Sequence, residues 1–328
     1  MGLKVSKCDS SPSNIKRIAS KKILVLGSHE SGKSTLIKQA HIIFNGGLVA
    51  KDDDASFYRS ITQGNVLESM LSTLYEMDSM EIALASQSNE IYRERLLKSK
   101  FYESCDNDDI IDCVQKIWFD TGVQEFLKWR ADLSDTLTYF FNSLDRINRA
   151  DFCPKNVDVL RAKIKTTGIY EHTFDIKEQQ YTIVDVGGTR SERKKWFHTF
   201  EGVQRILFCV ALSDYDQNLS EDGKTNRMKD SLQLFHTLCN DLFLKDVPIS
   251  VVFTKTDLFE RKIPSSPLQA HFPEYKGRNT KEDTCEFIQM LFHQQYANRN
   301  DKLHCHFINA LDSSNAQGLF DKLLDNTW

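Results

Sequence analysis

The feature this 328-residue chain most clearly lacks is proline over residues 13–153. Glycine is nearly missing too, with only Gly64 and Gly122 between residues 48 and 153. Because both residue types interrupt helices and mark turns, their scarcity excludes a turn-rich β architecture here. We therefore predict an all-helical unit over residues 48–155, with its aromatic and methionine side chains in its core. Helical three- and four-residue apolar spacing supports this, as in Val66, Met70, Leu74 and Met77, and in Trp118, Phe119, Val123, Phe126 and Leu127.

Other classes of feature are missing as well. No run approaches the roughly 18 apolar residues of a membrane-spanning helix, and no secretory signal opens the chain. The net charge of −4 gives no reason to expect a nucleic-acid partner. The eight cysteines form no C-x-x-C pair, which favours reduced thiols in a cytosolic protein. The run His304–His306 (HCH) lies in an alternating apolar stretch, so we predict a buried strand there rather than a metal site.

What the chain does contain is a phosphate-loop pattern, G-x-x-x-x-G-K-S, at Gly27–Ser34. It follows the apolar run Ile23–Leu26 and precedes the helix-forming segment Leu36–His41. In this strand–loop–helix context, backbone N–H groups and a helix N-terminus attract polyanions. Lys33 adds a charge for the β- and γ-phosphates, and Ser34 offers a hydroxyl to Mg²⁺. A simple glycine-containing turn is the alternative, and the register of the motif argues against it.

From about residue 158 onward, apolar strand-like runs alternate with helical stretches. This alternation predicts a mostly parallel sheet with helices on both faces, with an antiparallel hairpin where the connection between the first two strands is short. The expected strands, besides Ile23–Leu26, are Tyr170–Ile176, Tyr181–Val186, Ile206–Leu212, Ile249–Thr254 and Cys305–Ala310, and the expected helices are Asn226–Leu244, Asp283–Tyr296 and Ala316–Leu324.

Two more motifs follow predicted strands. Asp185–Gly188 (DVGG) places a carboxylate where it can reach Mg²⁺ through water, and its glycines let a backbone N–H approach a γ-phosphate. In Phe253–Asp257 (FTKTD), a carboxylate can accept two hydrogen bonds from guanine that adenine cannot supply. Asn309–Leu311 could present a backbone N–H to guanine O6. Each motif alone could be a strand-end turn, but together they predict a guanine-nucleotide site.

With their neighbours, these motifs resemble the α-subunits of heterotrimeric G proteins. Arg190–Trp196 (RSERKKW) after DVGG nearly matches the family's switch II, and Asp158–Ile169 is close to its switch I. Phe141–Ile147 resembles the end of its helical domain. The resemblance covers about residues 21–325. It implies an α/β fold: a Ras-like P-loop GTPase domain, with a mostly parallel six-stranded sheet and helices on both faces, and an inserted all-helical domain.

The resemblance also implies boundaries and individual roles. We expect an N-terminal membrane or partner segment at 1–20, the Ras-like domain at 21–47 and 156–328, and the helical domain at 48–155. Ser34 and Thr166 would ligate Mg²⁺. GTP or GDP would be bound by Glu30, Ser31, Gly32, Lys33, Ser34, Thr35, Asp135, Leu160, Arg161, Thr166, Asp185, Gly188, Lys255, Asp257 and Ala310.

The chain departs from the family at the positions that carry catalysis. Thr189 stands where the family has a glutamine that orients water, and it is too short for that role. Lys163 replaces the catalytic arginine and loses the planar guanidinium fork. His29 replaces a loop glycine near the γ-phosphate. At the base site, Thr254 replaces an asparagine and Asn309 a cysteine.

These departures predict a guanine-nucleotide-binding signalling switch that hydrolyses GTP slowly, with Lys163 and Thr189 at the catalytic positions. A replacement role for His29 or Lys163 remains open. The alternative function is a catalytically inactive scaffold of the same fold that binds partners with little or no nucleotide turnover.

The N-terminal residues match the pattern for N-myristoylation at Gly2. A single acyl chain binds membranes only marginally, so nearby lysines or an acylated Cys8 would supply a second signal. We expect a location at the cytoplasmic face of the plasma membrane or in the cytoplasm. Both ends are shorter than the family pattern, which makes binding of a βγ dimer and a receptor uncertain, and an effector is a further expected partner.

Overall fold

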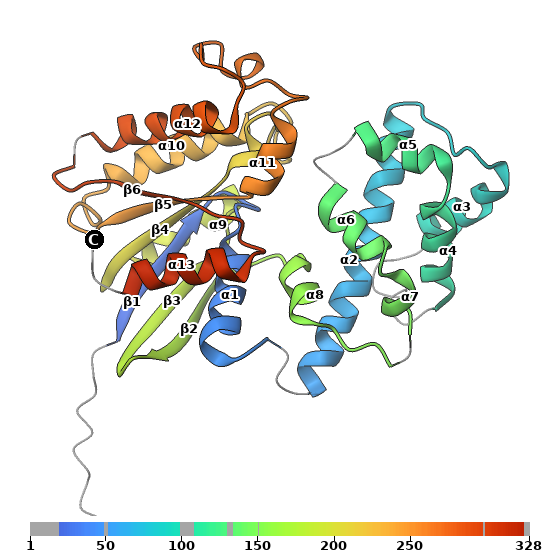
Figure 1. The fold of residues 1–328 in the computed structure, drawn as a ribbon. Coiled ribbons are helices and arrows are strands. Elements are labelled where there is room, and N and C mark those ends of the chain that lie inside the picture. The colour runs from blue at the N-terminus through green and yellow to red at the C-terminus, as the bar shows by residue number, and fades with distance from the viewer. Residues whose placement is uncertain are drawn as a thin grey trace, which may run out of the picture.

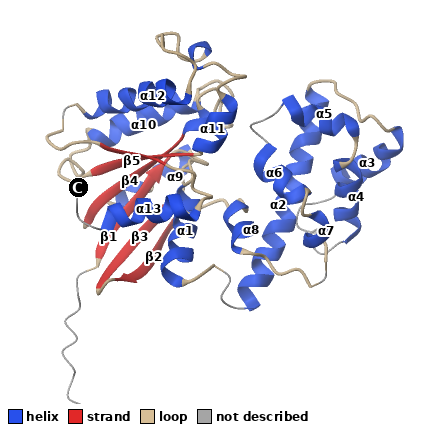
Figure 2. Ribbon diagram, in the orientation of Figure 1, coloured by secondary structure: helices blue, strands red, loops and turns tan. Residues whose placement is uncertain are grey.

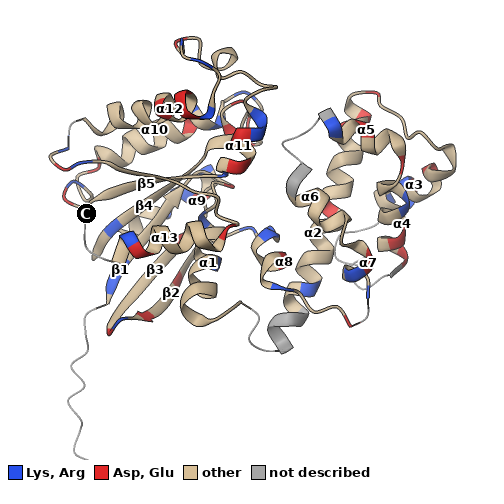
Figure 3. Ribbon diagram, in the orientation of Figure 1, with Lys and Arg blue, Asp and Glu red and all other residues tan. Residues whose placement is uncertain are grey.

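The computed structural model describes residues 20–48, 52–98, 108–129, 134–149, 151–297 and 299–324. Two bodies lie side by side in it, an α/β body and a helical body (Figure 1). Gly2, Cys8 and residues 1–19 of the predicted N-terminal segment lie outside the described residues. In the described part, no helix is long and apolar enough to cross a membrane. Acidic and basic residues are mixed along both bodies, as on an ordinary solvated surface (Figure 3).

The α/β body is built on a six-stranded sheet in the order β2-β3-β1-β4-β5-β6 (Figure 2). Neighbouring strands run parallel except for β2 and β3, which form an antiparallel hairpin. The hairpin turns through Lys177 and Glu178, both in the left-handed region, as tight hairpins require. The predicted parallel sheet with one hairpin is confirmed. The strands are β1 (Lys21–Gly27), β2 (Ile169–Ile176), β3 (Gln179–Val186), β4 (Val203–Ala211), β5 (Ile249–Thr254) and β6 (His304–Phe307).

Helices cover both faces of this sheet, because the central strands are apolar on both sides. On one face, α1 (Lys33–Asn45) and α13 (Ser313–Leu324) pack on alternate strand residues such as Val25. On the other face, α10 (Arg227–Cys239) and α12 (Lys281–Tyr296) pack on the residues between, such as Leu26. The shorter elements are α9 (Arg190–Arg193), η2 (Trp196–Thr199), η3 (Leu212–Asp214), α11 (Thr256–Lys262) and η4 (Leu268–Ala270).

The helical body occupies the chain between α1 and β2 and has a hydrophobic core of its own, which includes Met70, Ile117 and Phe140. Its described elements are helices, so the predicted fold class, α/β with an inserted all-helical unit, is confirmed. The boundaries at 47/48 and 155/156 stay predictions. The elements are α2 (Asp52–Ser79), η1 (Gln87–Asn89), α3 (Glu90–Lys98), α4 (Asp108–Trp118), α5 (Thr121–Trp129), α6 (Ser134–Phe141) and α7 (Leu144–Ile147).

A short helix, α8 (Asn156–Arg161), joins the helical body to switch I. Its Asp158 is fully buried and accepts hydrogen bonds from Arg146 and Tyr139 of the helical body. On its other side, Lys38 of α1 donates to the carbonyl oxygens of Val159 and Ala162, at 2.9 and 2.8 Å. The connection that leads into switch I is therefore held from both bodies.

The burial that the sequence predicted for the strand at His304–His306 is wrong. His304–Phe307 is a strand, but β6 forms the edge of the sheet and its residues are half-buried or exposed. An edge strand has a neighbour on one side only, and its alternation of residue types does not reveal that. Among the described residues, no group of three or more His, Cys, Asp or Glu side chains could hold a metal ion.

Two histidines link α1 to the strand that follows switch I. His41 Nε2 and His172 Nδ1 lie 3.0 Å apart and share a hydrogen bond, beside the ring of Phe174. Burial lowers the pKa of both imidazoles below the ordinary value of 6.5, and the charge of Asp185 opposes this at His172. Burial in the folded protein therefore favours the neutral form of both imidazoles.

This pair makes stability depend on pH. Since each folded-state pKa lies below its unfolded value, the unfolded chain binds more protons, and stability falls as the pH drops below about 6.5. We expect a His41→Gln, His172→Thr variant to lose less thermal stability than the wild type between pH 7.5 and pH 5.5. The exposed His198 provides the control as His198→Thr. Equal losses in the wild type and the double variant would contradict the prediction.

Candidate functional site

The phosphate loop turns from a buried strand directly into a helix. β1 ends at Gly27, with φ of 142°, beneath which the backbone of Cys209 leaves no room for a Cβ. Gly32, with φ of 88°, caps α1 without any side-chain hydrogen bond. The first N–H groups of α1 therefore have no side-chain acceptor in this loop, which is the arrangement that binds phosphate. The buried Ser31 Oγ has no hydrogen-bond partner either.

Lys33 brings a buried positive charge to this loop. Its Nζ donates to the carbonyl oxygens of Gly27 and Ser28, at 3.1 and 2.7 Å. Burial lowers the pKa of Lys33 to about 8, against the opposing charge of Asp185. The ammonium group thus lies inside the loop, at the position expected of a phosphate-binding lysine.

Three oxygen-bearing side chains meet beside the start of α1. Ser34 Oγ lies 2.9 Å from Thr166 Oγ1 and donates to Asp185 Oδ2 at 3.0 Å. Asp185 Oδ1 is buried with no hydrogen-bond partner, and burial raises the pKa of this carboxyl group. Two hydroxyls and a carboxylate with one unpartnered oxygen are the hard oxygen donors that suit Mg²⁺, which keeps several of its own waters. The structure brings together the residues that the sequence predicted for this ion.

Switch II packs closely against the loop. Trp196 Nε1 donates to Gly187 O at 2.9 Å, and Arg193 Nε donates to Gly188 O at 3.0 Å while its guanidinium pairs with Asp230 of α10 at 2.5 Å. A Cβ on Gly188 would lie 2.5 Å from Lys33 Nζ. The Gly188 backbone therefore approaches the phosphate loop as only glycine can.

The two residues at the predicted catalytic positions already have partners. Lys163 Nζ pairs with Glu30 Oε1 at 3.2 Å, and Thr189 Oγ1 lies 3.1 Å from Ser191 Oγ. Burial opposes ionisation of Glu30, but Lys163 and other nearby cations outweigh it and hold the pKa of Glu30 well below its usual range. Burial also lowers the pKa of His29, which favours a neutral imidazole next to this pair.

The predicted base-recognition residues gather at the ends of β5 and β6. Lys255 adopts the left-handed conformation, with φ of 56°, at the start of α11, two residues before Asp257. Thr254 is fully buried, and its hydroxyl donates to Ser31 O at 2.9 Å. Ala310 is buried, and its carbonyl accepts a hydrogen bond from Gln39 of α1. The hydrogen bond from Thr254 to Ser31 therefore ties the end of β5 to the phosphate loop.

The remaining predicted residues take varied positions. Thr35 is half-buried in the first turn of α1, and Leu160 is buried in α8. Arg161, also in α8, places its guanidinium over the ring of Tyr139 at 4.7 Å. Asp135 belongs to α6, and its side chain is outside the described part of the chain.

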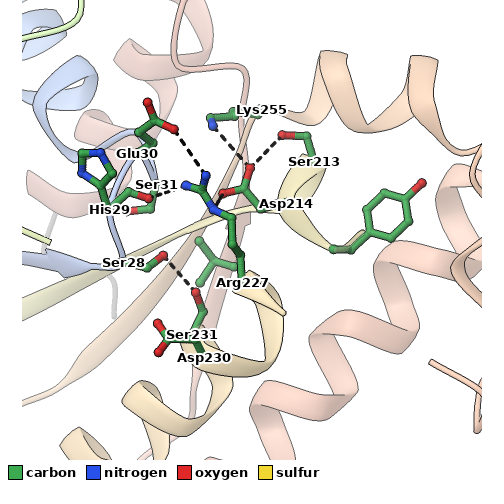
Figure 4. Close-up of polar contacts among 12 residues, drawn as sticks. Ser28, His29, Glu30, Ser31, Ser213, Asp214, Arg227, Asp230, Ser231 and Lys255 are labelled. Carbon is green, nitrogen blue, oxygen red and sulfur yellow. Dashed lines mark hydrogen bonds and ion pairs between the residues drawn. The ribbon is translucent and has the colours of Figure 1, made fainter. Parts of the chain in front are cut away.

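Two charged residues at this site escaped the sequence analysis. Arg227 of α10 donates to His29 O at 2.7 Å and pairs with Glu30 at 3.3 Å (Figure 4). Asp214 of η3 pairs with both Arg227 and Lys255, at 2.8 and 3.4 Å. Neither residue lies in one of the motifs described above, so the sequence alone did not mark either of them as a site residue.

This geometry defines a class of protein: a Ras-like P-loop GTPase fold with a helical insertion. The family model described as "G-protein alpha subunit" matches residues 5–327. The chain belongs to this family.

Named relatives support the assignment. The chain is 38% identical over 311 residues to the protein named guanine nucleotide-binding protein G(o) subunit alpha from Lymnaea stagnalis, covering 93% of this chain and 87% of the relative. It is equally similar, over 310 residues and with the same coverage, to the protein of that name from Caenorhabditis elegans.

Gly188 allows a direct test of the close packing at this site. We expect Gly188→Ala to destabilise the fold by about 1–3 kcal/mol, because its Cβ overlaps the Lys33 ammonium and the Ser28 carbonyl. Urea unfolding followed by circular dichroism measures the change. The matched control is Gly318→Ala in α13, where a Cβ meets nothing within 4 Å and should stabilise by about 0.5–1 kcal/mol. A Gly188→Ala variant as stable as the wild type would show that the approach is looser than described.

Proposed function

We propose that this protein is a guanine-nucleotide-binding signalling switch that requires Mg²⁺ and hydrolyses GTP slowly. The observation that carries the proposal is the phosphate loop, with its uncapped helix start and the buried Lys33 ammonium. Asp257 and Lys255 supply guanine recognition. Family membership and the printed names of the relatives, which are guanine-nucleotide-binding proteins, support the choice of nucleotide.

Mg²⁺ fits the donor set at the start of α1. Ser34 and Thr166 would ligate it directly, and Asp185, whose Oδ1 has no partner, would hold its water shell. The bound ion supplies positive charge opposite the β- and γ-phosphates. The chain itself contributes the hydroxyls, the buried carboxylate and the backbone N–H groups that hold the phosphates in place.

Slow hydrolysis follows from what the two catalytic positions offer. In this family and in Ras, an arginine that neutralises transition-state charge contributes about 10³–10⁵ in rate. Lys163 is a single point charge without the planar fork, and it is paired with Glu30. Thr189 has a short side chain near Ser191, so it is poorly suited to orient water over the γ-phosphate. Both changes weaken transition-state stabilisation while leaving ground-state binding available.

The first prediction from this proposed function is kinetic. In single-turnover hydrolysis of pre-bound GTP, with bound nucleotide quantified at time zero, the wild type should react slowly. A Thr189→Gln, Lys163→Arg variant should react at least about tenfold faster, because it regains the water-orienting amide and the arginine fork. Lys165→Arg is the matched control, since Lys165 is an exposed lysine two residues away.

Each alternative gives a distinct outcome in this experiment. Fast wild-type hydrolysis would refute slow turnover and point to a replacement group such as His29. No bound nucleotide at time zero would refute the switch and favour the scaffold. A variant that hydrolyses GTP faster than the wild type would show that Lys163 and Thr189 limit the rate. An unchanged rate would show that another group or step limits it.

The second prediction concerns the metal. Asp185→Asn should lower the Mg²⁺ affinity of the GTP-loaded protein by about 10–100-fold, because outer partners of a metal site contribute that much. The measurement is retention of a non-hydrolysable GTP analogue across a Mg²⁺ titration. Asp175→Asn, at an exposed position on β2, is the control. Retention that does not depend on Mg²⁺ in the wild type would exclude the proposed role of the ion.

Membrane attachment and partners complete the proposal. Acylation at Gly2, with Cys8 or nearby lysines as the second signal, would hold the switch at the cytoplasmic face of the plasma membrane. A βγ dimer, a receptor and an effector are the expected partners of a protein in this family. Switch II, with its exposed Lys194 and Phe197, offers a contact surface for them.

A further inference from the structure

A buried carboxylate connects the two ends of the candidate nucleotide site. Asp214 is only 4% exposed, in η3 at the end of β4. Its Oδ1 accepts from Lys255 Nζ at 3.4 Å and from Ser213 Oγ at 3.3 Å. Its Oδ2 forms an ion pair with Arg227 Nε at 2.8 Å. Each oxygen of the carboxylate thus faces a different cation (Figure 4).

Arg227 carries this connection to the phosphate loop. Its guanidinium uses a different nitrogen for each partner: Nε for Asp214, Nη1 for Glu30 and Nη2 for the carbonyl oxygen of His29. The side chain is 12% exposed, so water competes weakly for these contacts. One ion pair and two hydrogen bonds thus hold the same guanidinium between Asp214, Glu30 and His29. The position of Asp214 therefore influences where His29 and Glu30 lie.

Lys255 carries the connection to the base-recognition loop. It sits in the left-handed conformation between β5 and α11, and Asp257 follows two residues later. A left-handed lysine is held by its surroundings, since that conformation is unfavourable for residues with a side chain. Anchoring its ammonium on Asp214 restrains the loop that presents the Asp257 carboxylate.

We propose that Asp214 is a positioning residue that links guanine recognition to the geometry of the phosphate loop. The proposal rests on the guanine-nucleotide binding proposed above and goes beyond it. It assigns base selectivity in part to a carboxylate that acts through Lys255 and Arg227. Neutralising it removes the carboxylate charge that Lys255 and Arg227 share, so both ends of the site lose a restraint.

Two affinity ratios separate the two ends of the site. Inosine diphosphate lacks the 2-amino group that Asp257 would accept from, so the GDP/IDP ratio measures base recognition. GMP lacks the β-phosphate, so the GDP/GMP ratio measures the phosphate loop. We expect Asp214→Asn, which is isosteric, to reduce both ratios by about three- to tenfold, the scale of coupling between contacting residues.

A matched control tests whether the loss of any buried carboxylate charge in this region has the same effect as Asp214→Asn. Asp216 lies two residues along and pairs with Lys262 of α11 at 2.5 Å, and the Asp216 and Lys262 side chains are only 11% and 10% exposed. It has no described contact with Lys255 or Arg227. Asp216→Asn should therefore change stability while leaving both ratios at their wild-type values.

The outcomes are distinct. Unchanged ratios in Asp214→Asn, or a change in only one, would overturn the link. Equal weakening of all three nucleotides would reduce Asp214 to a structural role and also overturn it. Wild-type protein that binds no GDP would instead refute the proposed function itself.

A second measurement covers the case in which Asp214→Asn fails to fold. Arg227→Lys and Lys255→Gln are compared singly and together for GDP affinity. Non-additive effects are expected, because both side chains act through Asp214. Additive effects would overturn the link.

Discussion

The structure depends on one constraint: the chain must pass from a buried strand into a helix while leaving the first N–H groups of the helix without a side-chain cap. Gly27 and Gly32 make that passage possible, the first because of the Cys209 backbone beneath it and the second through its left-handed conformation. The carboxyl ends of parallel strands then bring Asp185 and Lys255 to the same edge. This edge is where open α/β sheets place their ligands.

Sequence reasoning predicted the fold correctly where the sequence pattern is local. The phosphate loop, the DVGG segment and the apolar strands are contiguous patterns, and each one forces a local geometry. It failed where a role depends on contacts across the chain. Arg227 lies 198 residues from His29, whose carbonyl it binds, and a charged residue on a helix looks like any solvated one. The burial of β6 was also mispredicted, because strand order, which sets burial, is not a local property.

Charge balance explains why several cations can share this small region. Lys33, Lys163, Arg227 and Lys255 face it from four separate segments of the chain, and Glu30 and Asp214 pair with the last three. Cations held on separate elements converge only if carboxylates between them offset their repulsion. The carboxylates therefore act as spacers that keep the positive groups aimed at one place.

The helical insertion holds the backbone of Lys163, which stands at a predicted catalytic position. Asn65 of α2 forms two hydrogen bonds with the Lys163 backbone, accepting from its N–H and donating to its carbonyl oxygen. Asn65 is 8% exposed, so this pairing is largely shielded from water. A shift of α2 relative to α1 must either break both bonds or carry Lys163 away from Glu30. Lys163, which we propose to stand at the position of the family's catalytic arginine, is thus positioned by the insertion as much as by the phosphate loop, and an arginine there would test the side chain without altering these backbone hydrogen bonds.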